Sequence, residues 1–224
     1  MKELNDGVIL DLGCGYGRIA KYLLPHRKFA GYVGIDRSMT MLKIFLDRYT
    51  GKAQEKETAL LLAVSFIDNE PLRDDSVDNV IVSAVFLHNH KVITKKSIDE
   101  IWRVMKPGAK LFVINSFPNL YNLTGLQGVL YLWLLKISGY EFKQGPVRYF
   151  SEYEVRTLLN KFSKIEIRYV GFLVLPKSIL IFPGFLNLVY RKIVFTPLQS
   201  KLESITPVKL KKMLCMHYDV IAYK

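Results

Sequence analysis

The feature that most constrains the fold is a glycine-rich turn directly after a short apolar run. Residues 8–12 read Val-Ile-Leu-Asp-Leu, which is typical of a strand buried on both faces, and glycines follow at positions 13, 15 and 17. Glycine lets the backbone turn sharply after a strand and approach a ligand closely, with its N–H groups aimed outward. The pattern predicts a strand–turn–helix unit of a parallel sheet with a ligand at the turn.

Strand-like and helix-like segments alternate along the first half of the chain, which favours a doubly wound α/β sheet. Strands are expected at 8–12, 32–36, 59–66, 77–84 and 111–114, and helices at 19–24, from 39 after a Ser38 cap, and at 98–105 before Pro107-Gly108. Later helices are expected at 152–162 and 208–214, and later strands at 164–174 and 218–223. We therefore expect a Rossmann-like sheet of seven strands, mostly parallel with the last strand antiparallel, in a single domain over residues 1–224.

Two segments, 117–150 and 176–206, depart from this alternation and are expected to be insertions on the substrate side. Residues 129–135 are apolar around the whole circumference of a helix, so they must be buried, line an apolar pocket or touch a membrane. They either pack against residues 179–188 as the private core of a lid, or form with them an apolar cover over the substrate site.

An acidic residue at the end of the second strand complements the glycine turn. Asp36 lies 23 residues after Gly13, at the spacing from which a carboxylate accepts both hydroxyls of a ribose. Position 18 is arginine, where the dinucleotide fingerprint would have its last glycine. The pattern predicts a nucleoside-bearing ligand and disfavours a nicotinamide or flavin dinucleotide.

These segments resemble class I S-adenosylmethionine-dependent methyltransferases of the type 11-like group. Residues 8–20 and 31–41 are similar to the first two motifs of that family. Residues 70–78 resemble the stretch that leads into its fourth strand, and residues 101–108 the helix and turn before its fifth. The likeness covers about residues 7–116. It implies S-adenosylmethionine as the cofactor and methyl transfer by in-line displacement.

The resemblance also implies which residues hold the cofactor. The glycine loop would face its methionine end, Asp36 its ribose, Met41 and Phe66 its adenine, and the end of the fourth strand its methyl side. Relatives carry an aspartate at Phe66, for which Asp68 is a substitute, and a helix before the first strand, whose part the insertions and C-terminal region would take. The full expected set is Asp11, Gly13, Cys14, Gly15, Tyr16, Gly17, Asp36, Arg37, Met41, Phe66, Ile67, Asp68, Ser83, Ala84 and Val85.

Four further residues are candidates on the acceptor side. His88 and His90 follow the fourth strand, where ligands gather in a parallel sheet, and either one is a candidate general base or a structural residue. Two histidines without a third ligand argue against a metal site. Arg148 and Tyr149, just before a Ser151 helix cap, either contact the substrate or anchor a loop.

The charge of the chain points to an anionic partner. The chain has 32 basic and 20 acidic residues, a net charge of +12, and residues 176–224 place basic side chains beside apolar segments. A small-molecule or lipid-like acceptor, with isoprenoids among the candidates, fits an enzyme peripheral to an anionic membrane. The alternatives are an RNA methyltransferase, for instance one acting on tRNA, and a catalytically degenerate S-adenosylmethionine-binding protein.

Composition also bears on location. Cys14 and Cys215 lie far apart, and Met1 is followed by charged and polar residues, so neither a disulfide scaffold nor a secretory leader is expected. No apolar stretch approaches the roughly 20 residues that span a bilayer. The sequence therefore predicts a cytoplasmic protein, with peripheral membrane contact as an option.

Overall fold

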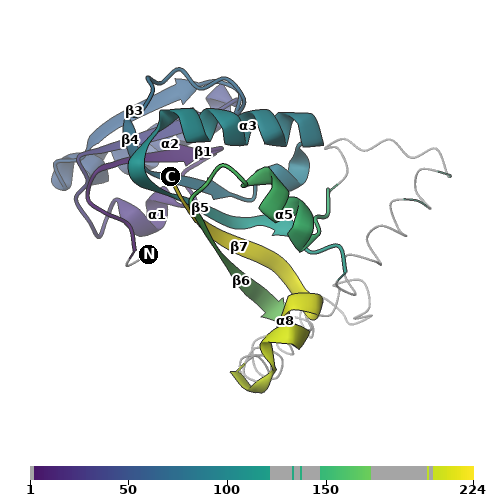
Figure 1. Ribbon diagram of the computed structural model, residues 1–224. Coiled ribbons are helices and arrows are strands. Elements are labelled where there is room, and N and C mark those ends of the chain that lie inside the picture. The colour runs from purple at the N-terminus through teal and green to yellow at the C-terminus, as the bar shows by residue number, and fades with distance from the viewer. Residues whose placement is uncertain (1–2, 122–132, 134–136, 138–146, 173–200, 202–203) are drawn as a thin grey trace.

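The computed structural model describes residues 3–121, 133, 137, 147–172, 201 and 204–224 (Figure 1). Its helices and strands in chain order are β1 (Val8–Leu12), α1 (Ala20–Leu23), β2 (Gly31–Asp36), α2 (Met39–Glu55), β3 (Ala59–Val64), β4 (Val77–Ser83), the 3-10 helix η1 (Phe86–His88), α3 (Lys91–Val104), β5 (Met105–Pro118), α5 (Glu152–Leu158), β6 (Lys164–Phe172), α8 (Val208–Leu214) and β7 (Cys215–Tyr223).

The strands form one seven-stranded sheet in the order β3-β2-β1-β4-β5-β7-β6. Neighbouring strands from β3 to β5 pair in parallel, and β7 runs antiparallel to both of its neighbours, β5 and β6. The predicted Rossmann-like sheet with an antiparallel last strand is therefore confirmed. Between β1 and β4 the strand order reverses, and open α/β sheets bind ligands beyond the strand ends at such a point.

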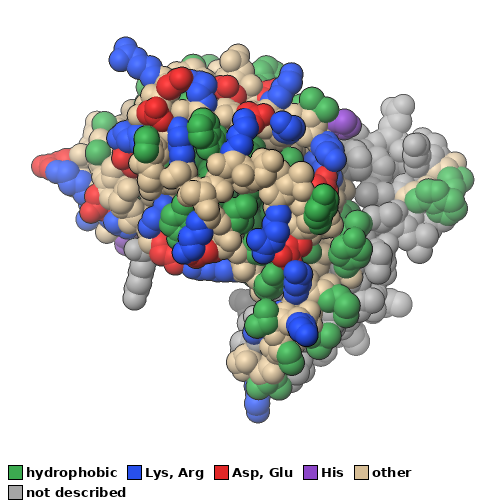
Figure 2. All heavy atoms as spheres, viewed as in Figure 1, with side chains coloured by type: hydrophobic (Ala, Val, Ile, Leu, Met, Phe, Trp, Pro, Cys, Tyr) green, Lys and Arg blue, Asp and Glu red, His purple; other side chains and the backbone are tan. Residues whose placement is uncertain are grey.

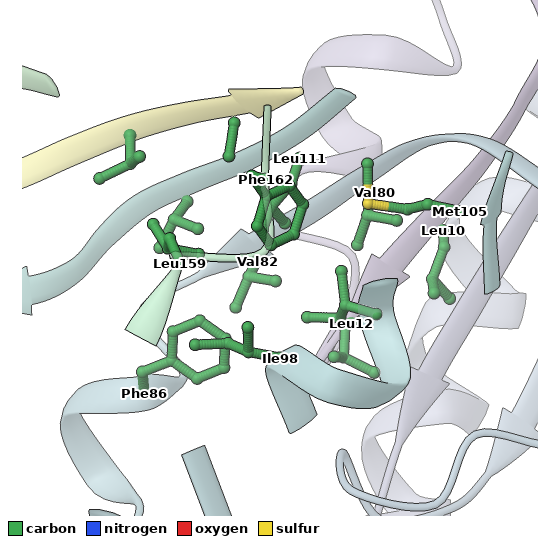
Figure 3. Close-up of a cluster of buried hydrophobic side chains, with 14 of the residues drawn as sticks. Leu10, Leu12, Val80, Val82, Phe86, Ile98, Met105, Leu111, Leu159 and Phe162 are labelled. Carbon is green, nitrogen blue, oxygen red and sulfur yellow. The ribbon is translucent and has the colours of Figure 1, made fainter. Parts of the chain in front are cut away.

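Successive side chains of the central strands point to opposite faces of the sheet, and each face has its own helices. Leu10 packs on the face covered by α3 and α5, whereas Ile9 packs on the face covered by α1 and α2. Alternation of this kind makes both faces of β1 apolar, as its sequence predicts. The cluster on the α3–α5 face includes Leu10, Leu12, Val80, Val82, Ile98, Leu111 and Leu159 (Figure 3).

Several boundaries differ from the sequence prediction. Helix α3 begins at Lys91 and not at residue 98. Its first half carries no apolar repeat, because the buried positions there are filled by the small polar residues Thr94 and Ser97. Strand β5 begins at Met105 and passes through Pro107-Gly108, predicted to be a stop. A register shift opposite β4 and the positive φ of Gly108 accommodate the pair as an irregularity in the strand. Strand β3 ends at residue 64 and α5 at residue 158, both earlier than predicted, and β7 begins at Cys215 and not at residue 218.

The apolar segment 129–135, except residue 133, and most of 176–206 lie outside the described residues, so their assignment to a lid stays a prediction. Within the described part of the chain, no helix has the length and apolar character needed to cross a membrane.

Candidate functional site

The glycine turn adopts the left-handed backbone that its sequence predicts. Gly13, Gly15 and Gly17 have φ values of 71°, 53° and 89°. A Cβ at Gly13 would lie 2.5 Å from a methyl carbon of Val85, and a Cβ at Gly17 would lie 2.3 Å from the ring of Tyr49. The first and third glycines are therefore required both for conformation and for space.

Asp36 connects this turn to the end of β2 and the start of α2. Its Oδ2 accepts a hydrogen bond from the backbone N–H of Gly15 at 2.9 Å, and its Oδ1 accepts one from the N–H of Ser38 at 2.8 Å. Each carboxylate oxygen has a further lone pair. The partly buried carboxylate is thus held in place while retaining acceptors for a ligand's hydroxyl groups.

Asp36 and the turn border one cleft of about 330 Å³ at the carboxyl ends of the parallel strands. We call this space the glycine-loop cleft. Nine of the residues predicted for the site line this cleft, together with Ser65, Asn89 and Ile93. The nine predicted residues are Gly13, Asp36, Arg37, Phe66, Ile67, Asp68, Ala84, Val85 and His88.

Phe66 and Asp68 occupy the side of this cleft that follows β3. Phe66 is 67% exposed, so its ring offers an apolar face to a ligand without being fixed by a core. Asp68 is partly buried and places a carboxylate in the same lining. Both residues thus line one cleft, and the role of Asp68 as a substitute for the relatives' aspartate stays a prediction.

Asp11 does not line the glycine-loop cleft, although it was predicted to bind the cofactor. It is buried under the turn, and Tyr32 of β2 donates a hydrogen bond to its Oδ2 at 2.6 Å. Burial raises the pKa of this carboxyl to about 7, against the opposing effects of the Tyr32 hydrogen bond and the nearby Arg18 guanidinium. In this structure the Asp11 side chain is therefore a buried partner of Tyr32.

Arg18 was noted in the sequence only because it replaces a glycine, but it joins two walls of the site. Its Nη2 donates to the backbone oxygen of Ser83 at 2.7 Å and to the Ser83 hydroxyl at 3.0 Å. The contact links the start of α1 to the end of β4, 65 residues later. The spacing of residues near Arg18 in the sequence could not predict a hydrogen-bond partner so far along the chain. Ser83 itself lies behind the cleft lining.

The remaining residues of the predicted cofactor set are not among those that line the cleft. Tyr16 is exposed, with the Arg48 guanidinium 5.4 Å from its ring centroid, and Met41 is exposed near the start of α2. Cys14 is buried, and burial raises the pKa of its thiol far above the usual range. A thiol in that state is a small packing group and a poor nucleophile.

The two predicted histidines lie in different places. His88 ends η1 and lines the glycine-loop cleft with an exposed side chain. His90 is the N-cap residue of α3, is exposed and does not line that cleft. Between them, Asn89 fixes the turn because its side-chain amide donates to the Val85 carbonyl at 2.8 Å. Only His88 has the position of a candidate general base.

Arg148 and Tyr149 lie next to η1. The Arg148 N–H donates to the Leu87 carbonyl at 2.8 Å, and its guanidinium pairs with Glu154 and stacks 4.3 Å from the ring centroid of Phe150. These contacts favour the loop-anchoring interpretation of Arg148. Burial raises the pKa of the half-buried Tyr149 hydroxyl, and its direct contact with a substrate stays a prediction.

No group of three or more His, Cys, Asp or Glu side chains that could hold a metal ion occurs among the described residues. The lining of the described cleft combines glycine backbone, two carboxylates, apolar side chains and a histidine.

Comparisons with known proteins agree with this description. Residues 10–113, which run from β1 into β5, match the family described as "Methyltransferase domain". The protein 235L of Invertebrate iridescent virus 6, named as an inferred methyltransferase, is 27% identical over 126 residues, 56% of this chain and 43% of its own. This chain thus spans less than half the length of that curated relative.

Solved structures of similar fold come from archaea and bacteria. An S-adenosylmethionine-dependent methyltransferase of Methanosarcina mazei has a TM-score of 0.64 at 17% identity, with 100% of this chain and 95% of that chain covered. One from Mesorhizobium loti has a TM-score of 0.61 at 16% identity, with 100% and 94% covered. Likeness at these identities shows the shared fold.

Proposed function

We propose that this chain is a class I S-adenosylmethionine-dependent methyltransferase that transfers a methyl group from S-adenosylmethionine to a small-molecule or lipid-like acceptor. One observation carries the proposal: a left-handed glycine turn, the Asp36 carboxylate and the end of β4 border a single cleft of about 330 Å³. The family supplies the reaction class, and the cleft supplies the place for it.

The residues of the glycine-loop cleft suit S-adenosylmethionine. The Gly13 backbone approaches Val85 so closely that a side chain at position 13 would clash, so that part of the cleft is lined by backbone alone. Asp36 and Asp68 supply acceptors for ribose hydroxyls and an amino group, and their negative charge suits a cationic sulfonium. Phe66 offers a ring face to an adenine.

The chain's own part in the reaction is to position the reactants. Bound S-adenosylmethionine supplies a methyl group that its sulfonium has already activated. Asp36 would hold the ribose end, while Ala84 and Val85 form the wall beside the methyl side. The acceptor then approaches past His88, at the rim of the cleft. Alignment of two reactants by such walls accelerates an in-line displacement without further chemistry.

A hydroxyl acceptor also has to lose a proton, and we assign His88 as the general base for that case. Its side chain is exposed at the cleft, and histidine is the side chain that most often serves as a general base. His90 is assigned no catalytic role, because it caps α3 outside the cleft lining.

A lipid-like acceptor is favoured by the apolar residues 129–135 and 179–188 and by the excess of basic over acidic residues in 176–224. The net charge of +12 also suits RNA, which is the competing acceptor class. RNA-binding surfaces place aromatic side chains among basic ones as stacking platforms, whereas these aromatic residues stand mostly in apolar runs.

The deciding experiment gives the full chain S-adenosylmethionine labelled in its methyl group, with separated lipid, RNA and protein fractions of cells. Label in the lipid or small-molecule fraction supports the proposal, and label in RNA overturns its acceptor class. Asp36→Ala serves as the control that should lose transfer to every fraction. Absence of transfer from wild-type protein to any fraction would favour a degenerate binding protein.

A further inference from the structure

The segment around α8 combines exposed apolar and basic side chains on one projection of the molecule. We call the following nine side chains the α8 surface. Figure 2 shows green apolar and blue basic side chains interspersed on the lower projection, where Figure 1 places α8. The apolar members Ile205, Val208, Leu210, Met213 and Met216 are 70%, 68%, 41%, 52% and 39% exposed. The basic members are Lys201, Lys209, Lys211 and Lys212.

Isolated exposed apolar residues are normal, but five within twelve residues form a patch that calls for a partner. The segment 201–216 has four lysines and one glutamate, a net charge of +3. Among the described residues, only Lys212 of these lysines has an ion-pair partner, Glu152 at 2.9 Å. The other three are available to an anionic partner that also accepts apolar side chains.

A cleft next to α8 has the same mixed character. It measures about 540 Å³ and lies between α8 and α5, with Arg156, Lys209 and Met213 in its lining. Tyr153 of α5, 81% exposed, borders it as well. Tyrosine with an apolar body and a polar tip is enriched at the headgroup level of membranes.

The α8 surface lies at the same end of the sheet as the glycine-loop cleft. Strand β7 is antiparallel to β5, so its first residues pair with the last ones of β5, as His217 does with Pro118. The side chain of Asn119 then donates to the carbonyl oxygens of Met213 and Cys215 at 3.1 and 3.0 Å. A partner on α8 would therefore face the end of the sheet at which methyl transfer is proposed.

From these observations we infer that the α8 surface docks the protein on a bilayer containing anionic phospholipids. This inference rests on the proposed function, because a lipid-like acceptor places the enzyme at a membrane. Lysine side chains attract anionic headgroups while exposed apolar side chains enter the interface. Neither a soluble phosphate nor RNA would account for the five exposed apolar side chains.

The test measures sedimentation of the full chain with phosphatidylcholine vesicles that contain or lack phosphatidylglycerol. Wild-type protein should sediment with the anionic vesicles only, and less at high salt. Lys209→Gln with Lys211→Gln should raise the lipid concentration for half-saturation roughly thirtyfold. Val208→Ser with Met213→Ser should weaken binding to the same vesicles. Lys43→Gln with Lys52→Gln, an equal loss of charge on the exposed face of α2, should leave it unchanged.

Three results would overturn the docking surface. They are equal binding to neutral vesicles, unchanged binding of both α8 variants, and displacement from vesicles by inorganic phosphate or RNA at constant ionic strength. Calorimetry with S-adenosylhomocysteine on the same samples separates the two proposals. Retained nucleoside binding without vesicle binding removes the docking surface alone, whereas vesicle binding without nucleoside binding removes the proposed function.

Discussion

Removing the Asp36 carboxylate tests the assignment on which the proposed function depends. The carboxylate accepts backbone hydrogen bonds from Gly15 and Ser38 and borders the glycine-loop cleft. In Asp36→Ala, the charge-assisted hydrogen bonds to a ribose would be lost, about 1–3 kcal/mol. That loss corresponds to an affinity for S-adenosylhomocysteine about 5- to 150-fold weaker. Isothermal titration calorimetry measures it directly.

The same carboxylate also holds the glycine turn, so the variant needs two comparisons. Asp36→Asn keeps one oxygen for two backbone donors and should bind with intermediate affinity. Asp47→Ala removes an exposed carboxylate from α2 and should bind like the wild type. Unchanged affinity in Asp36→Ala, with an unchanged thermal unfolding midpoint, would refute the ribose assignment. Binding of NADH as tight as that of S-adenosylhomocysteine would refute the exclusion of dinucleotides.

Three further predictions concern the turn, the core and the rim. Gly13→Ala should lower the free energy of unfolding, measured in urea, by about 2–4 kcal/mol, because position 13 has a left-handed φ and a Cβ there would lie 2.5 Å from Val85. Gly51→Ala, in α2 where no atom lies near the added Cβ, should raise that free energy by about 0.5–1 kcal/mol. Burial raises the pKa of Glu70 from 4.5 to about 8, and neither carboxylate oxygen has a hydrogen-bond partner in the described structure. Between pH 4.5 and about 8 the native state thus keeps a proton on Glu70 that the unfolded state releases. The free energy of unfolding should therefore decrease as the pH rises through this range. Urea titrations of Glu70→Leu at several pH values should no longer show that decrease. His88→Ala should slow transfer to a hydroxyl acceptor by about 10²- to 10⁴-fold in kcat and abolish its pH profile, and His90→Ala should change neither; the reverse pattern would contradict the assignment.

The parts of the site that sequence reasoning found are those set by short-range geometry. A strand, a turn of alternating glycines and a carboxylate at the end of the next strand are linked by backbone contacts, as in the bond from the Gly13 N–H to the Ile35 carbonyl at 2.8 Å. The resemblance to methyltransferases follows from that local pattern, and the match of residues 10–113 to a methyltransferase domain family and the shared fold agree with it. The activity and the cofactor stay proposals. The acceptor does not follow from it, because the segments predicted for the substrate side, 117–150 and 176–206, carry no such pattern.

The parts that sequence reasoning missed depend on contacts between distant residues. Arg18 donates a hydrogen bond to Ser83, 65 residues later, and Asp11 accepts one from Tyr32, 21 residues later. Local spacing in the sequence indicates neither partner. The first half of α3 was missed because the small polar Thr94 fills a buried position. Pro107 was read as a stop because a proline cannot continue a helix, although it can occupy an irregular strand start.

The position of β7 has a consequence for how the chain assembles. Strand β7 separates β5 from β6, although it is synthesised after both. Until residues 215–223 emerge, one edge of β5 and the whole of β6 have no sheet partner, and pairing must wait for a segment about a hundred residues downstream of β5. We therefore expect insertion of β7 to be the late step of folding, and the nascent chain to be most prone to misassociation just before it.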